Sequence, residues 1–402
     1  MLSTKKIATS HIYSFFELST AMKFNYSFNS FSQYLNELTK KLRLAVIYGG
    51  DKQRAGAVIY KTHNPRSTKT YEAVAKNIAQ AFKNLGFQNV WLLPDDMSLA
   101  AQLKAKQIHL AWLNTGGVQG YDPVCHTPAL LEMLGVPYIG HSPINSSILD
   151  NKHLLKRELK GLGFPTSPFM VWHPHQETFQ PNNLYFQHLF GNYTGAFLVK
   201  PVSGRASLNI HFVDKPDALA AAIADVQRVT HNSALIEAYL PGREFCIAVG
   251  GYVTYINLQL QKRQSPFAFS AIERILEPDE KIFTSMDKKA ITSDRLRLLS
   301  DREPIKQQLE QIAKDVYRSF NLTALIRLDL RTDRSGKLYI LEANPKPDLK
   351  RPTANATSLV AQGLTEYGMS YEDLILSLFC DRLDYLLSNY PHLIAHIVEL
   401  LD

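Results

Sequence analysis

The stretch YILEANPKPDL, from Tyr339 to Leu349, begins as an apolar strand and ends in a Pro-Lys-Pro turn. Side chains alternate across a strand, so residues two apart project from the same face. Glu342 and Asn344 therefore lie together on one face, and the apolar residues beside them lie on the other. The end of this strand thus offers carboxylate and amide oxygens to one point in space.

A second apolar strand, ALIRLDL, precedes this stretch and carries Arg327 and Asp329, again two residues apart. The segment between the two strands, RTDRSGK, is short and contains Asp, Ser and Gly, which suit a tight turn. The two strands are therefore predicted to form a hairpin. Four polar side chains then converge on one face of the sheet.

Three oxygen-bearing side chains beside a guanidinium indicate a hard cation next to an anion. Mg²⁺ prefers oxygen ligands and is commonly shared between one or two carboxylates and substrate phosphates. The cluster has no Cys or His, which argues against zinc. A structural alternative stays open, in which Arg327 and Asp329 form a salt bridge and Asn344 caps a turn.

Composition describes an ordinary globular protein. A chain of 402 residues predicts two or three domains, and 45% hydrophobic with 20% charged residues is typical of soluble proteins. The three cysteines are far apart without a CxxC spacing, so neither a disulfide framework nor a zinc site is expected. No apolar run approaches the length of a membrane helix, so we expect a cytoplasmic protein without a membrane partner.

The net charge of +7 comes from 44 basic against 37 acidic residues, a mild excess spread along the chain. No block of Lys and Arg with interleaved aromatic residues marks a nucleic-acid surface, so no nucleic-acid partner is expected. The excess favours attraction of a small anionic substrate.

The order of elements predicts an α/β (α+β) protein of three domains after an extension. Residues 1–42 show no clear period and form an amino-terminal extension of unknown role. Residues 43–149 alternate strands with helices and predict a parallel-sheet α/β domain. Residues 150–241 predict a small central α+β domain. Residues 242–402 predict an antiparallel-sheet domain, in which Tyr252–Leu260 reads as one strand.

Several spaced motifs resemble the ATP-grasp enzymes and, within them, the D-alanine–D-alanine ligases. They are LDNKHLLKRELKGLGFPTSPF, FLVKPVSGRASLNI, LIEAYLPGREF, IRLDL, LEANPKPDL and the late segment TSLVAQGLTEYGMSYEDLILSLF. The resemblance spans about residues 43–385 in the family's motif order. It implies the ATP-grasp fold and ATP-dependent ligation of a small-molecule carboxylate to an amine, through an acyl phosphate. A homodimer is a further expectation from the family.

The resemblance assigns roles to individual residues. ATP would lie between two antiparallel sheets, with its phosphates on Lys152 and Lys200. Its adenine would meet Glu237, Ala238, Tyr239 and Leu240, and its ribose would meet Glu244. Two Mg²⁺ ions, replaceable by Mn²⁺, would be held by Asp329, Glu342 and Asn344.

The resemblance also implies a catalytic set. Arg327 would stabilise the transferred phosphoryl group and the later tetrahedral intermediate. Ser207 belongs to the family's phosphate-binding loop, and Ser358 matches the serine that binds the acceptor's carboxylate. Phosphoryl transfer needs positioning and charge neutralisation rather than a covalent nucleophile, which agrees with the absence of a Ser-His-Asp or Cys-His pattern.

The departures from the family fall at substrate positions. The family's glutamate after the first strand is replaced by a segment with Lys61, His63 and Arg66. The turn after the metal strand is longer and more basic, with Lys346 and Arg351. These cations are candidates to pair with additional anionic groups of a substrate.

Three hypotheses follow. The first is a D-alanine–D-alanine ligase-like enzyme. The second is a related ligase that joins an amino acid to a different acyl donor, such as the mycosporine-type enzymes. The third is a non-catalytic nucleotide-binding protein with a regulatory role, which the presence of Arg327, Asp329, Glu342 and Asn344 disfavours.

Overall fold

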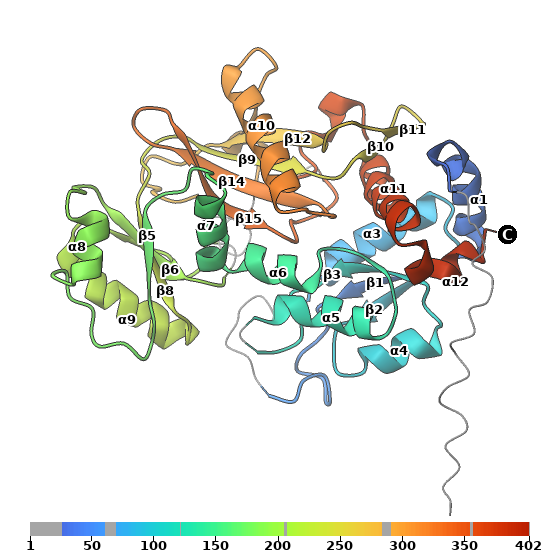
Figure 1. Cartoon of the computed structure of the whole chain (residues 1–402), viewed down its shortest axis with the longest axis horizontal. Coiled ribbons are helices and arrows are strands. Elements are labelled where there is room, and N and C mark those ends of the chain that lie inside the picture. Colours follow the sequence, from blue (N-terminus) through green and yellow to red (C-terminus); the bar gives the residue numbers. More distant parts are fainter. Residues whose placement is uncertain are drawn as a thin grey trace, which may run out of the picture.

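The computed structural model describes residues 26–60, 70–120, 122–204, 207–283, 291–353 and 357–401. Its strands form a four-stranded parallel sheet, a four-stranded and a five-stranded antiparallel sheet, and a separate two-stranded hairpin. Each of the three sheets draws its strands from one of the ranges expected for the three domains, as Figure 1 shows. The domain boundaries themselves stay predictions.

The parallel sheet has the strand order β2-β1-β3-β4, with helices packed around it. The helix α3 ends where the sequence favours it, because Gly86 adopts a φ of 92° and its N–H bonds to the carbonyl of Lys83. The elements are β1 (Arg43–Tyr48), α3 (Glu72–Asn84), β2 (Asn89–Pro94), α4 (Leu99–Ala105), β3 (Leu110–Asn114), α5 (His126–Met133), β4 (Tyr138–Ile139) and α6 (Pro143–Asp150).

The central antiparallel sheet has the order β5-β8-β6-β7. The helix α7 begins at Lys152, where the side chain of Asn151 accepts hydrogen bonds from two backbone N–H groups of the first turn. The elements are α7 (Lys152–Gly161), β5 (Phe169–Trp172), α8 (Leu184–Phe190), β6 (Phe197–Pro201), β7 (His211–Val213), α9 (Leu219–Thr230) and β8 (Ala234–Ala238).

The second antiparallel sheet has the order β13-β12-β9-β14-β15. The predicted hairpin is confirmed: β14 and β15 pair with Arg327 opposite Asn344 and Asp329 opposite Glu342. The elements are β9 (Glu244–Val249), β12 (Ala268–Arg274), β13 (Leu296–Leu298), α10 (Pro304–Ser319), β14 (Ile326–Thr332) and β15 (Leu338–Asn344).

The reading of Tyr252–Leu260 as one strand is wrong. The structure divides it into β10 (Val253–Ile256) and β11 (Gln259–Lys262), which pair as a hairpin. The two residues between them, Asn257 and Leu258, both have positive φ values, of 51° and 62°. A two-residue turn of this kind usually has glycine at its second position, where Leu258 stands here, so the turn was not predictable from its residues.

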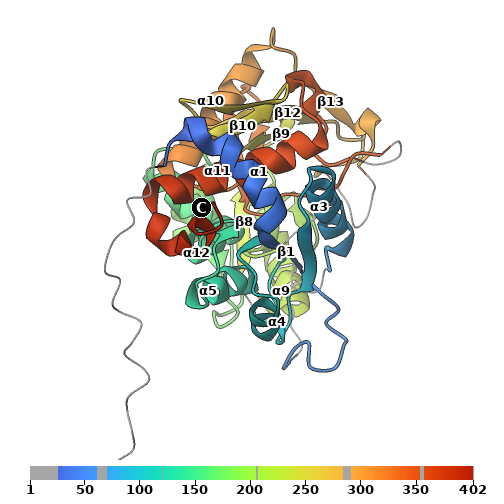
Figure 2. The ribbon, with the colours of Figure 1, turned by 90° about the vertical axis from the view of Figure 1, so that its right-hand side faces the viewer.

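Residues 26–42 pack onto the body of the protein. They contain the helix α1 (Phe31–Lys41), although the sequence showed no clear period there. Phe31, Leu38 and Leu42 are fully buried in a core shared with the carboxyl-terminal helix α11 (Tyr371–Asn389). Figure 2 shows α1 beside α11. This core also joins α3 and the residues after it to α11, because the rings of Phe82 and Phe87 pack edge-on against Phe379.

Short helices complete the described chain. They are η1 (Phe28–Ser30), η2 (Pro123–Cys125), η3 (Pro216–Ala218), η4 (Ser293–Arg295), η5 (Leu364–Tyr367), η6 (Pro391–Ile394) and α12 (Ala395–Val398). Within the described residues, every helix is too short or too polar to cross a membrane.

Candidate active site

A cavity of about 920 Å³, partly open to solvent, lies between the two antiparallel sheets and the start of α7. Most of the residues that the sequence singled out line it. From the central part these are Lys152, Lys200, Ser207, Glu237, Ala238, Tyr239 and Leu240, and from the second sheet they are Glu244, Arg327, Asp329, Glu342 and Asn344. The structure therefore brings together residues that are up to 192 positions apart in the chain.

The hairpin β14–β15 presents its polar side chains to this cavity. Arg327 donates Nε and Nη2 to the two carboxylate oxygens of Asp329, at 2.7 and 2.8 Å. Arg274, at the end of β12, approaches the same carboxylate at 2.8 Å. The salt bridge that the sequence left open as an alternative is thus present, and it involves two arginines.

Glu342 has a different environment from Asp329. Its carboxylate lies 3.4 Å from Nζ of Lys152 and accepts a hydrogen bond from Nδ2 of Asn344, also at 3.4 Å. Burial would raise the pKa of Glu342, but the charges of Lys152, Lys200 and Arg327 hold this pKa well below its usual range. The carboxylate is therefore ionised and available to a cation.

These residues fit a magnesium site that is completed by substrate. Among the described residues, no group of three or more His, Cys, Asp and Glu side chains is placed to hold a metal by itself. Asp329, Glu342 and Asn344 supply two carboxylates and an amide oxygen. Mg²⁺ is commonly bound by one or two carboxylates, with waters and substrate phosphates as the remaining ligands.

A buried ion-pair network connects α7 to the central sheet. Glu237 on β8 contacts both Lys156, at 2.9 Å, and Lys200 on β6. Burial opposes ionisation of Glu237, but the two ammonium groups more than offset this effect and lower its pKa to about 2. The network fixes Lys200 and the first turns of α7 on one wall of the cavity.

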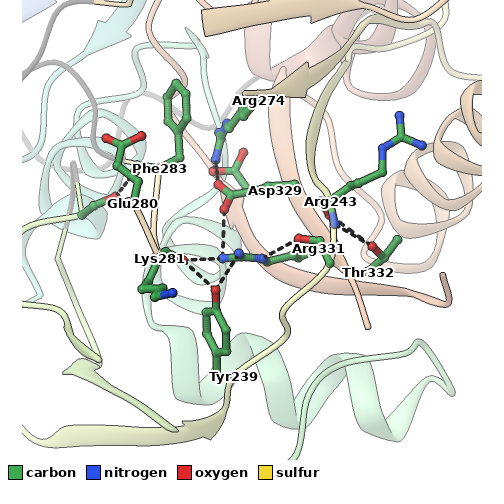
Figure 3. Close-up of polar contacts among 12 residues, drawn as sticks. Tyr239, Arg243, Arg274, Glu280, Lys281, Phe283, Asp329, Arg331 and Thr332 are labelled. Atoms are coloured by element: carbon green, nitrogen blue, oxygen red, sulfur yellow. Dashed lines mark hydrogen bonds and ion pairs between the residues drawn. The ribbon is translucent and has the colours of Figure 1, made fainter. Parts of the chain in front are cut away.

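Glu244 also lines the cavity, and its carboxylate lies between two arginines. Its Oε1 accepts from Nη1 of Arg274 at 2.9 Å, and its Oε2 accepts from Nη1 of Arg331 at 3.3 Å. Arg331 also donates to the hydroxyl of Tyr239 at 2.9 Å. Figure 3 shows how the side chains of Tyr239 and Arg331 meet beside the backbone of Lys281.

A segment after β12 covers part of the cavity. Ile282 and Phe283 line the cavity, and the hydroxyl of Ser207 donates to the carbonyl oxygen of Phe283 at 3.0 Å. The ring of Phe283 lies under the guanidinium of Arg295, with 4.3 Å between the guanidinium carbon and the ring centre. Ser207 thereby ties its loop to this covering segment.

Two of the residues predicted to bind substrate, Ser358 and Lys346, do not line this cavity. Ser358 is fully buried outside the cavity, and its Oγ accepts the N–H of Ala361 at 3.0 Å. Its proposed contact with an acceptor stays a prediction. Lys346 lines a smaller cavity of about 490 Å³, and its Nζ lies 3.1 Å from the centre of the Tyr71 ring.

The remaining substrate candidates do not define a site. Arg351 pairs with Glu372 at 2.6 Å and stacks on Tyr371, so its charge is already matched inside the protein. Lys61, His63 and Arg66 lie outside the described residues.

Sequence reasoning missed Lys156, Arg274 and Arg331. Two of them had a usable signal. Lys156 is one helical turn from Lys152, and Arg331 continues the alternation of Arg327 and Asp329 along the same strand face. Arg274 had none, because its position beside Asp329 depends on the pairing of β12 with β9.

Two antiparallel sheets that enclose a cavity rich in lysines and carboxylates define the ATP-grasp class of ligases. The D-alanine–D-alanine ligase of Bacillus anthracis, solved as a complex with ATP, superposes with a TM-score of 0.63 at 18% identity, over 86% of this chain and 99% of that one. The ligase of Coxiella burnetii gives a TM-score of 0.61 at 19% identity, over 90% and 99%. The expected ATP-grasp fold is confirmed.

Sequence comparison gives the family. The family described as "D-ala D-ala ligase C-terminus" matches residues 159–380, more than half of the chain. The D-alanine–D-alanine ligase of a Marinomonas species is 25% identical over 352 residues, covering 85% of this chain and 96% of that protein. An uncharacterised protein of Sinorhizobium fredii is 27% identical over 266 residues, covering 64% and 70%. The chain belongs to the D-alanine–D-alanine ligase family and is an ATP-dependent ligase.

Proposed function

We propose that this protein joins a small carboxylate to an amine by way of an acyl phosphate, with D-alanine as donor and acceptor. The observation that carries the proposal is the convergence of Arg327, Asp329, Glu342 and Asn344 with Lys152 and Lys200 in one cavity. This combination of acidic metal ligands and fixed cations suits a triphosphate.

The proposed reaction has two steps. The donor carboxylate attacks the γ-phosphorus of ATP, which breaks the bond to the β-phosphate oxygen and releases ADP. The amine then attacks the acyl carbon, and phosphate leaves with one oxygen from the donor. Because such transfers depend on positioning and charge neutralisation, fixed cations can supply most of the catalysis.

Three cations of the cavity are suited to these steps. We assign Lys152 and Lys200 to the phosphates of ATP, since carboxylate contacts hold both ammonium groups at the cavity wall. We assign Arg327 to the transferred phosphoryl group and to the oxyanion of the tetrahedral intermediate. Its bidentate contact with Asp329 holds the guanidinium plane in one orientation.

Asp329, Glu342 and Asn344 would hold two Mg²⁺ ions, for which Mn²⁺ can substitute. Bound Mg²⁺ would supply neutralisation of phosphate charge. Both carboxylates lie among positive side chains, which hold them in fixed positions for this task.

The nucleotide would extend toward the covering segment. We assign Glu237 and the backbone of residues 238–240 to the adenine, and Glu244 to the ribose. Leu198, Ile210 and Ile282 are apolar residues that line the cavity, which suits a purine ring.

The finer features of the proposal rest on the sequence pattern and on the family resemblance. They are the domain boundaries at residues 43–149, 150–241 and 242–402, a contact of Ser358 with the acceptor, a dimeric state and a cytoplasmic location. Lys346 is assigned to the substrate region because it follows the metal strand directly and its cavity lies beside Asn114 and Pro345.

The test is ADP release by the purified protein with Mg·ATP, first with D-alanine alone and then with a panel of carboxylates and amino acids. The proposal expects ADP and a dipeptide in equal amounts with D-alanine, with mass spectrometry to identify the product. Turnover with another pair and none with D-alanine would refute the substrate assignment. ADP release without any amide product would refute the ligase reaction.

A further inference from the structure

Glu244, Arg274 and Arg331 form one row across three strands. In the register of the sheet, Arg274 on β12 lies opposite Glu244 on β9, and Arg331 on β14 lies opposite Glu244 from the other side. Directly opposite residues project from the same face of a sheet. The carboxylate of Glu244 is therefore held between two guanidinium groups by the strand pairing itself.

Arg331 makes contacts well beyond Glu244. Its Nη1 also donates to the carbonyl of Lys281 at 2.9 Å, its Nη2 to the hydroxyl of Tyr239 at 2.9 Å and its Nε to the carbonyl of Gly242 at 3.2 Å. The guanidinium also stacks on the Tyr239 ring, with 4.8 Å between its carbon and the ring centre. Tyr239 in turn donates to the carbonyl of Lys281 at 3.1 Å.

These contacts, shown in Figure 3, join three segments around the end of the cavity that holds Glu244. They are the strand end that carries Tyr239, the turn at Gly242 and the covering segment at Lys281. The side chain of Arg331 is only 6% exposed, so its hydrogen bonds do not compete with bulk water. A single arginine thus fixes the positions of the carboxylate and of its surroundings.

The pairing leaves acceptor capacity on both oxygens of Glu244. A carboxylate offers about four lone-pair sites, and each oxygen receives one guanidinium N–H from the two arginines. Glu244 lines the cavity, so each oxygen can accept one further hydrogen bond there. Two adjacent acceptors at fixed positions match the 2′- and 3′-hydroxyl groups of a ribose.

We propose that Arg331 is a positioning residue that orients Glu244 toward both ribose hydroxyls, so that the site selects ribonucleoside over 2′-deoxyribonucleoside triphosphates. The inference rests on the proposed function, which puts ATP in this cavity. Without Arg331, one oxygen of Glu244 loses its anchor and Tyr239 loses its contact with β14. The carboxylate can then turn to a single hydroxyl, and the selection weakens.

The experiment measures the dissociation constants of Mg·ATP and Mg·2′-deoxyATP by calorimetry, in wild type and in three variants. Arg331→Met removes all the hydrogen bonds of the guanidinium at similar side-chain length. Arg331→Lys keeps the charge but cannot reach Glu244, Tyr239 and Lys281 together. Arg334→Met is the matched control, because Arg334 lies in the exposed turn after β14. Melting curves establish that each variant is folded.

We expect wild type to bind ATP about tenfold more tightly than 2′-deoxyATP. The missing 2′-hydroxyl removes one hydrogen bond to a charged group, and the free energy of such a bond corresponds to about this ratio of dissociation constants. Arg331→Met should reduce this ratio to about threefold or less, mainly by weakening ATP binding, and Arg331→Lys should give an intermediate ratio. Arg334→Met should keep the wild-type ratio. If kcat is measured with substrates, it should change far less than the KM for ATP in Arg331→Met.

Two results separate the inference from the proposed function. A wild-type protein that binds neither nucleotide would refute the nucleotide site, and the inference with it. A wild-type protein that binds both equally, or a folded Arg331→Met or Arg331→Lys variant that keeps the full wild-type ratio, would refute the inference and leave the proposed function standing.

Discussion

Replacing Glu237 by Gln should destabilise the folded protein severely, although the change removes only one charge. The carboxylate of Glu237 is 1% exposed and contacts both Lys156 and Lys200, whose side chains are 0% and 6% exposed. Gln has the same shape but offers no negative charge. Two buried ammonium groups would then lie beside a neutral amide, with no compensation for their lost hydration.

The magnitude follows from the pKa of Glu237. This pKa falls from 4.5 to about 2 in the folded protein, and a difference of this size corresponds to about 3 kcal/mol of folding free energy. Loss of one partner from a buried ion pair costs about 3 to 5 kcal/mol in other proteins. Because the folded-state pKa is lowered, the contribution is fully present above about pH 4.5 and is lost as the pH falls toward 2.

The assay is urea unfolding at pH 7, followed by circular dichroism. The free energy of unfolding of Glu237→Gln should be about 3 kcal/mol below that of wild type. Glu158→Gln is the matched control, since Glu158 lies on the exposed face of α7, and it should change stability by less than about 0.5 kcal/mol. A loss below about 1 kcal/mol in Glu237→Gln would show that the two lysines do not depend on this carboxylate.

Four further predictions concern the site and one buried acid. Glu342→Gln should abolish ADP release in a protein that still folds, and wild-type turnover in this variant would remove Glu342 from the metal site. Arg327→Ala should lower kcat by about 10² to 10³, as loss of one oxyanion donor does elsewhere, and unchanged kinetics would exclude it from the mechanism. Excess EDTA should stop ADP release and Mn²⁺ should restore it, whereas turnover in EDTA would contradict a metal requirement. Burial raises the pKa of Asp381 to about 6, although hydrogen bonds from the N–H groups of Tyr252 and Val253 oppose this effect. The free energy of unfolding should therefore fall as the pH rises through 6, and Asp381→Asn should remove this fall and gain up to about 3 kcal/mol at pH 7.5. The same pH profile of unfolding in wild type and Asp381→Asn would contradict this prediction.

The hairpin of the metal strand was predictable because alternation across strands is a local rule. Arg327 and Asp329, like Glu342 and Asn344, needed only their spacing and a short polar turn to be placed on one face. The same rule extends to Arg331 once the strand is known to continue to Thr332. Local periodicity thus identifies which residues share a surface.

Which other residues contact that surface in the folded chain depends on pairing between strands that are far apart in the sequence. Local sequence patterns do not predict this pairing. The contact of Arg274 with Asp329 requires β9 to lie between β12 and β14. The burial of Ser358 and the pairing of Arg351 with Glu372 likewise depend on how the chain returns after β15. The turn at Asn257 and Leu258 escaped prediction because neither residue is a glycine.

The central claim is that a donor carboxylate becomes an acyl phosphate in the cavity lined by Arg327 and Glu342. The most direct measurement uses a donor whose carboxylate carries ¹⁸O, with mass spectrometry of the phosphate released during turnover. Attack of the carboxylate on the γ-phosphorus predicts ADP as the nucleotide product and one ¹⁸O atom in each phosphate. Unlabelled phosphate, or ¹⁸O appearing in AMP, would contradict the account.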